Sequence, residues 1–128
     1  MKLWMSGRID HDIADDHFRT VLNSVEQTVN FAIKDKDYGA SIESWDVIVV
    51  IYKEKTEDFF RYNARAKETD IEISIDYDAF KSSDVKTGKA LFFDALVRSL
   101  ERLKGDKKIK DFAFDKAIDD IRNIATMH

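Results

Sequence analysis

The chain has 128 residues, 44% of them hydrophobic, with a formal charge of −4 and neither cysteine nor proline. This length predicts a single domain over residues 1–128, and the apolar content is sufficient for a packed core. The absence of cysteine excludes disulfides, thiol catalysis and thiolate metal sites. The acidic balance disfavours a generic nucleic-acid binder, which is usually basic, and permits a basic partner.

The N-terminal segment Lys2–Ile9 alternates apolar and polar residues, which is the period of a strand with one buried face. Gly7 within it predicts a bulge or a close approach of another part of the chain. The segment lacks the apolar core of a signal peptide, and no stretch is long enough to span a bilayer. We therefore expect a cytoplasmic protein without membrane contact.

An amphipathic helix is predicted after an acidic loop, Asp10–Asp16, and is expected to end near Lys34. Asp15 or Asp16 is expected to cap its N-terminus. Gly39, just beyond the helix, is suited to a turn with positive φ. The helix is predicted because apolar residues recur three and four positions apart: Phe18, Val21, Leu22, Val25, Val29 and Ala32.

The central segment, Ser44–Asp76, predicts three strands that the rest of the chain covers. The run Val47–Tyr52 is apolar at every position, which is typical of a strand buried on both faces. Residues 59–66 and 71–76 alternate, as half-buried strands do. Because short charged turns join the three strands, we expect an antiparallel meander.

The remaining residues predict helices. A short helical turn at Tyr77–Phe80, capped by Asp78, precedes a helix over Gly88–Lys104 that Gly105 ends, and a last helix covers Asp111–Thr126. The order of elements is therefore β-α-β-β-β-α-α. We expect an α+β domain with a mostly antiparallel sheet and with helices packed mainly on one face.

The acidic loop contains carboxylate and imidazole groups of the kind that ligate metal ions. These residues are Asp10, His11, Asp12, Asp15, Asp16 and His17. Their spacing matches neither an EF-hand loop nor a His-x-x-x-His pair on one helix face. A solvated loop that caps the following helix is the simpler interpretation, and docking of a basic partner is favoured over metal binding.

No motif for catalysis or for a cofactor is present: the chain has no Gly-x-Ser-x-Gly sequence and no glycine-rich loop. Phe60 and Tyr62 alternate with Arg61, so we expect these rings in the core and not stacked on nucleic-acid bases. A second acidic group contains Glu68, Asp70 and Glu72. Several acidic surfaces without a catalytic motif favour a protein that binds a basic protein.

Three segments with distinctive core patterns are Leu3–Ile9, Ile73–Phe80 and Ala90–Leu100. Over about Met1–Leu103, the chain resembles immunity proteins of bacterial polymorphic toxin systems, including those of contact-dependent growth inhibition. The resemblance implies a non-enzymatic protein, made beside a secreted toxin and kept in the cytoplasm. It also implies binding to the C-terminal domain of the cognate toxin, in many systems a nuclease with a basic cleft, without direct binding of nucleic acid.

The residues expected to contact such a toxin are first Asp10, Asp12, Asp15 and Asp16, and then Glu68, Asp70 and Glu72. No catalytic, metal-ligating or cofactor-binding residue is predicted. Two other functions stay open. One is a small metal-dependent hydrolase that uses the Asp10–His17 loop, and the other is a generic protein-binding adaptor.

Overall fold

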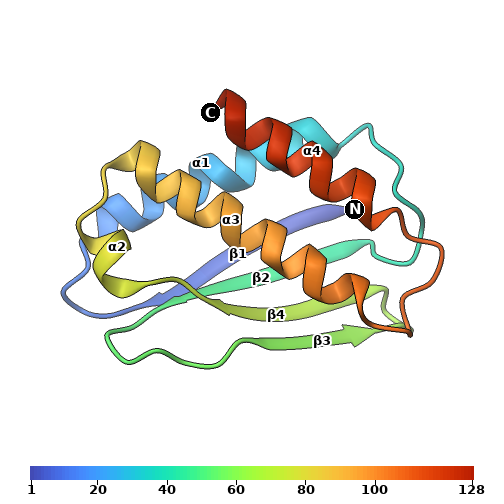
Figure 1. The fold of residues 1–128 in the computed structure, drawn as a ribbon, viewed down its shortest axis with the longest axis horizontal. Helices are drawn as coiled ribbons and strands as arrows, with labels where there is room; N and C mark the ends of the chain where they lie inside the picture. Colours follow the sequence, from blue (N-terminus) through green and yellow to red (C-terminus); the bar gives the residue numbers. More distant parts are fainter.

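The computed structural model describes all residues from Met1 to His128 and contains four strands and four helices (Figure 1). In chain order they are β1 (Lys2–Ile9), α1 (Asp15–Ile33), β2 (Ser44–Ile51), β3 (Phe59–Asn63), β4 (Glu68–Ser74), α2 (Tyr77–Lys81), α3 (Val85–Lys104) and α4 (Phe114–Met127). The predicted order of elements is confirmed, and α2 is the predicted short helical turn.

The four strands form one mixed sheet in the order β1-β2-β4-β3. β1 pairs with β2 in parallel, β2 pairs with β4 in parallel, and only β3 runs antiparallel to its neighbour β4. The α+β class is confirmed, but the expected meander does not form, and the sheet is mixed and not mostly antiparallel. The reason is burial: β2 is apolar throughout Val47–Ile51 and takes a central position, whereas β3 carries Arg61 and Asn63 and suits an edge.

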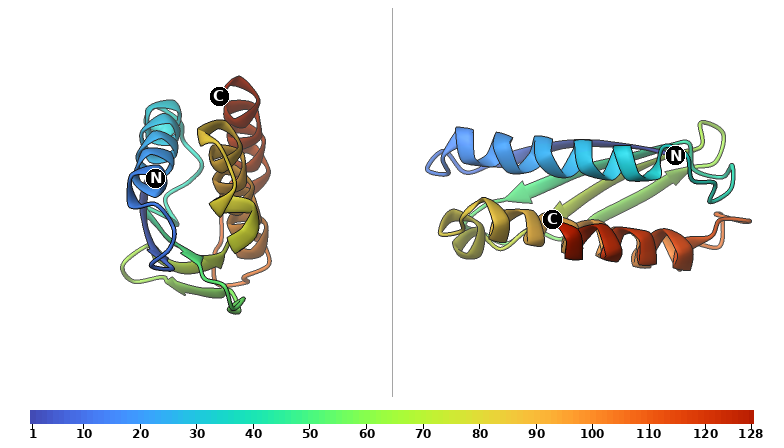
Figure 2. Two further views of the ribbon diagram at one scale, coloured as in Figure 1. Left: turned by 90° about the vertical axis from the view of Figure 1, so that its left-hand side faces the viewer. Right: turned by 90° about the horizontal axis from the view of Figure 1, so that it is seen from above.

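The long helices cover one face of this sheet and leave the opposite face uncovered, as predicted (Figure 1, Figure 2). α1 and α3 lie on the strands, and α4 packs on α1 and α3. This third layer explains why α3 is buried on more than one side. None of the four helices combines the length and the apolar character needed to cross a bilayer.

The core lies between the sheet and the helices. The strands contribute the buried residues Leu3, Met5, Trp45, Val47, Val49, Ile51, Ile71 and Ile73. Phe18 of α1 meets them next to Gly7, where an added Cβ would lie 2.2 Å from Cζ of that ring. The close approach predicted at Gly7 is thus confirmed, as is the positive φ of Gly39, which is 114°.

The helix starts differ from the predictions because the backbone conformation before each helix, and not only a side-chain cap, sets where it begins. α1 begins after Ala14 without a side-chain cap, so neither Asp15 nor Asp16 is the N-cap. Asp76, and not Asp78, caps α2 by accepting a hydrogen bond from the Ala79 N–H at 2.8 Å. Two further starts move in opposite directions. α3, capped by Asp84, begins at Val85, three residues before the predicted start, whereas the φ of 54° at Asp111 delays α4 to Phe114.

Candidate functional site

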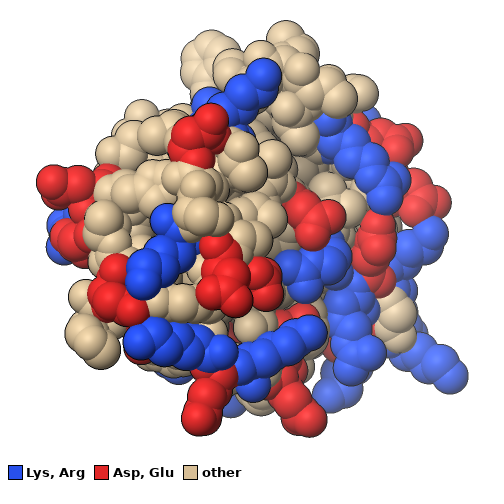
Figure 3. All heavy atoms as spheres, turned by 60° about the vertical axis from the view of Figure 1, so that its left-hand side comes forward, with Lys and Arg blue, Asp and Glu red and all other residues tan.

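The carboxyl ends of β1, β2 and β4 meet at one edge of the sheet, because these strands are parallel. The loop after β2, the end of β4, the start of α2 and one side of α3 line a cleft of about 610 Å³ there. Its charged lining residues are Lys53, Lys55, Arg98, Glu57, Asp58, Asp76 and Asp78. Acidic and basic side chains are interspersed on this side of the molecule (Figure 3), so the strand-end surface is mixed in charge.

Asp12, one of the predicted contact residues, is held beside this cleft by three side chains. Its Oδ2 lies 3.1 Å from Nζ of Lys53 and 3.2 Å from Nζ of Lys81, and it accepts a hydrogen bond from the Tyr77 hydroxyl. The hydrogen bond from Tyr77 and the two lysines lower the pKa of Asp12 well below its usual range. Asp12 therefore ties the loop after β1 to the loop after β2 and to α2.

The same contacts act on the two lysines. The hydrogen bond to Asp12 raises the pKa of Lys53, and the hydrogen bonds to Tyr77 and Asp12 raise the pKa of Lys81. Both ammonium groups stay charged near neutral pH. The cluster combines one carboxylate with two ammonium groups, and its main effect is to position three segments of the chain.

The other members of the acidic loop have separate surroundings. Asp10 Oδ2 accepts a hydrogen bond from the Lys53 backbone N–H at 2.6 Å, and Asp15 pairs with Arg19 at 2.8 Å. Asp16 is exposed and has no ion pair. This loop therefore presents fewer free carboxylates than its composition suggested.

The loop does not assemble the metal site that the hydrolase alternative requires. No group of three or more His, Cys, Asp or Glu side chains lies close enough together to hold a metal ion. His17 Nε2 lies 3.0 Å from the Ser83 hydroxyl, and its ring stacks on Phe80 with the centroids 4.8 Å apart. His17 thus faces α2 and the start of α3, while Asp12 faces the lysines.

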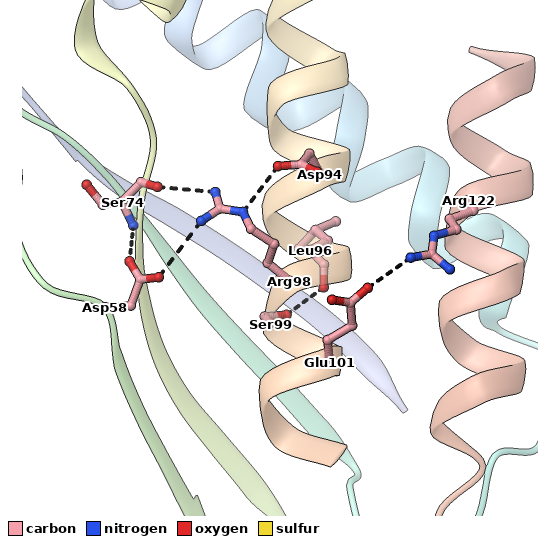
Figure 4. A network of polar contacts seen from close by, with 8 residues as sticks. All are labelled: Asp58, Ser74, Asp94, Leu96, Arg98, Ser99, Glu101 and Arg122. Atoms are coloured by element: carbon pink, nitrogen blue, oxygen red, sulfur yellow. Dashed lines mark hydrogen bonds and ion pairs between the residues drawn. The ribbon is translucent and has the colours of Figure 1, made fainter. Parts of the chain in front are cut away.

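Arg98 of α3 forms a second polar network at the cleft (Figure 4). Its guanidinium lies 3.1 Å from Oδ2 of Asp94 and 3.8 Å from Oδ2 of Asp58, and it donates to the Ser74 carbonyl at 3.3 Å. Asp58 Oδ1 also accepts from the Ser74 N–H at 2.8 Å. Our sequence reasoning missed this network. The i,i+4 spacing of Asp94 and Arg98 was its only local signal.

The second predicted acidic group lies on the uncovered face of the sheet, away from the helices. Asp70 pairs with Arg61 of β3 at 2.7 Å, and Glu72 pairs with Arg8 of β1 at 2.5 Å. Glu68 has no ion pair. The seven predicted contact residues therefore belong to two surfaces, the strand ends and the uncovered sheet face.

The uncovered face also carries residues that our sequence reasoning did not select. Trp4 and Phe59 expose 50% and 46% of their surface there. Asp46 of β2 stands directly opposite Asp70 in the neighbouring strand. Trp4 shares one side of β1 with Ser6 and Arg8, and this side lies on the face that no helix covers.

The fold and these surfaces define a small α+β domain in which charged groups are arranged around the ends and one open face of a sheet. The chain belongs to a family of immunity proteins: the family model described as Immunity protein 44 (Imm44) matches residues 1–127. This match confirms the resemblance and extends it over the C-terminal helix. Membership of the family implies that the chain binds and neutralises a cognate toxin. Comparisons with curated proteins and with solved structures give no match.

Proposed function

We propose that this protein protects the bacterium that produces it by binding the C-terminal domain of a cognate toxin in a stoichiometric complex, without catalysing a reaction. The observation that carries the proposal is the family match over residues 1–127. The pairing of Asp12 with Lys53 and Lys81 is consistent with it, because this cluster joins three segments of the chain through Oδ2 of Asp12.

The toxin in this proposal is a nuclease with a basic substrate cleft, delivered by a polymorphic toxin system such as contact-dependent growth inhibition. The complex forms in the cytoplasm of the producing cell. The formal charge of −4 supports a basic partner, because opposite net charges accelerate association. Glu68, in the second acidic group, is a carboxylate without an internal ion pair and so is open to a cation of the toxin.

A co-expression experiment tests the proposal. This protein and the toxin domain encoded in the adjacent reading frame are produced together in a sensitive host, and growth and co-purification are scored. We expect growth to be rescued and a complex of fixed stoichiometry to be recovered. Continued toxicity and no complex, with both proteins expressed and the toxin domain active, would contradict the proposal.

The nuclease part of the proposal has its own test. The toxin domain, separated from the complex, is assayed on RNA and DNA with and without this protein, and the association rate is measured at about 30 mM and about 150 mM salt. We expect nucleic-acid cleavage that this protein inhibits, and an association rate that falls several-fold as screening increases. A rate that is insensitive to salt would exclude steering by acidic residues while leaving the immunity function intact.

A further inference from the structure

The uncovered face of the sheet is formed by alternate residues of all four strands, and no helix lies over it (Figure 2). One row crosses the strands with, in order, Trp4, Asp46, Asp70 and Arg61. The adjacent row contains Ser6, Ile48, Glu72 and Phe59. The face therefore combines aromatic, aliphatic and charged side chains within a short distance.

Two exposed aromatic residues mark the opposite margins of this face. Trp4 lies on the edge strand β1 and Phe59 on the edge strand β3, and each exposes about half of its surface. The other tryptophan, Trp45, is fully buried under the helices. Large aromatic side chains contribute strongly to binding when a partner removes them from water. Their position on one uncovered face suits them to a protein partner.

The middle strands place like charges together. Asp46 and Asp70 are direct neighbours in the parallel pair of β2 and β4, and like charges at such positions destabilise a sheet. Arg61 compensates Asp70, but Asp46 accepts only a hydrogen bond from the Ser44 hydroxyl at 3.0 Å. Glu68, opposite Ser44, also lacks an ion pair. A cationic side chain from a partner would relieve this repulsion.

The strand-end surface offers less to a partner. Asp12 is neutralised by Lys53 and Lys81, and Asp10 is bonded to the backbone of Lys53. Arg98 is likewise engaged with carboxylates of its own chain. The charges around Asp12 and Arg98 hold the loops in place, and Lys55, Glu57 and Asp78 have no ion pair there. The uncovered face, in contrast, keeps unpaired carboxylates together with two exposed aromatic rings.

We infer that the cognate toxin docks on the uncovered face of the sheet, with Trp4 and Phe59 against its apolar surface and its Lys or Arg side chains against Asp46 and Glu68. The inference rests on the proposed function and names the surface that performs it. Strands of eight residues extend over about 26 Å, and the four strands span about 14 Å between the outer axes. This area suits the centre of an interface that buries about 800 Å² on each partner.

Fluorine NMR tests the inference because the chain has only two tryptophans, one on this face and one in the core. Both are replaced by 5-fluorotryptophan, and the Trp4→Phe variant assigns the two signals. The unlabelled toxin domain, recovered from the co-expressed complex and refolded, is then added to saturation. A soluble paramagnetic agent, added before and after the toxin, broadens the signal of a solvent-exposed tryptophan. We expect the Trp4 signal to shift when the toxin binds and to be broadened no longer by the agent, while the Trp45 signal changes little.

A Trp4 signal that keeps its free position and its broadening in the saturated complex would overturn the docking inference and leave the proposed function standing. Failure of the unsubstituted chain to form any complex in the co-expression experiment would instead overturn the proposed function, and the docking inference with it. The two failures are distinguishable because they appear at different steps, co-expression and titration.

Matched variants give an independent test. We expect Trp4→Ala and Asp46→Lys each to weaken toxin binding at least about tenfold, and Asp16→Lys, at the strand ends, to weaken it less than about threefold. Thermal unfolding verifies that each variant is folded, and Asp46→Lys is expected to be at least as stable as the parent chain. The reverse order of effects on binding would overturn the inference. The inference would also be overturned if this chain formed dimers that the Trp4→Ala substitution dissociates while toxin binding stays unchanged.

Discussion

The side-chain amide of Asn30 makes two hydrogen bonds to the backbone of Leu3. The Leu3 N–H donates to Oδ1 of Asn30 at 2.8 Å, and Nδ2 of Asn30 donates to the Leu3 carbonyl at 2.8 Å. Two residues further along β1, the Met5 N–H donates to Oε2 of Glu26 at 2.6 Å. Because β1 is an edge strand, α1 thereby satisfies backbone groups that a neighbouring strand would otherwise take.

Replacing Asn30 by alanine is expected to lower the free energy of unfolding by about 1–3 kcal/mol, because both backbone groups of Leu3 lose their partner. The freed edge is also expected to promote self-association. Urea unfolding measures the first effect, and light scattering measures the second. Asn23→Ala, an exposed position on the same helix, is the control and should change stability by less than about 0.5 kcal/mol. Equal stability of the two variants would contradict the role of Asn30.

Gly7→Ala is expected to destabilise the fold by about 1–3 kcal/mol, because the added Cβ would lie 2.2 Å from Cζ of Phe18 and 3.0 Å from Cγ2 of Val49. Differential scanning calorimetry measures the loss. Gly105→Ala is the matched control, since its Cβ would approach only the Arg102 carbonyl, at 3.4 Å. That control is expected to be neutral. An unchanged melting temperature for Gly7→Ala would show that Phe18 can move aside.

The stability contributed by Asp12 is expected to depend on pH. Its carboxyl has a pKa that folding lowers from the ordinary value of 3.8, with the Tyr77 hydroxyl as the largest cause. The contribution is therefore fully present above pH 3.8 and is lost as the pH falls through the lower folded pKa. Thermal unfolding of the parent chain and of Asp12→Asn, between about pH 2 and 7, measures the difference.

We expect the difference between the two melting temperatures to be constant near neutral pH and to shrink with increasing acidity. A difference for Asp12→Asn that does not change down to the lowest pH would indicate that the charge of Asp12 is unimportant for folding.

Arg98→Met is expected to cost about 1 kcal/mol of stability, since its ion pairs are partly solvent-exposed. The larger effect should be local, because Arg98 joins the end of β4 to Asp58, the last residue before β3. Hydrogen exchange should accelerate in residues 52–58. Arg122→Met, which breaks the pair with Glu101 at 2.9 Å, is the control and should leave that loop protected. Equal exchange in both variants would contradict the positioning role of Arg98.

Much of the fold was predictable from patterns that act over a few residues. The strand Lys2–Ile9 matches its prediction at both ends, and the last turn of α1 was predicted to within about one residue. These predictions succeed because side chains alternate with a period of two in a strand and recur with a period of 3.6 in a helix. The same local reasoning failed at Asp15 and Asp78, where the helix starts depend on which nearby group satisfies the first backbone N–H groups.

The strand order and the roles of the charged residues depended on contacts between distant segments. β4 lies between β2 and β3 because the apolar β2 needs a neighbouring strand on each side. No local sequence pattern indicates which strand is the second neighbour of β2. Asp12 meets Tyr77 across 65 positions of sequence, so its carboxylate could not be recognised as paired from the loop alone. Trp4 is exposed for the same reason. The sequence indicates that its side of β1 is the less apolar one, but the packing of α1 and α3 on the opposite face leaves that side open to solvent and, in our proposal, to the toxin.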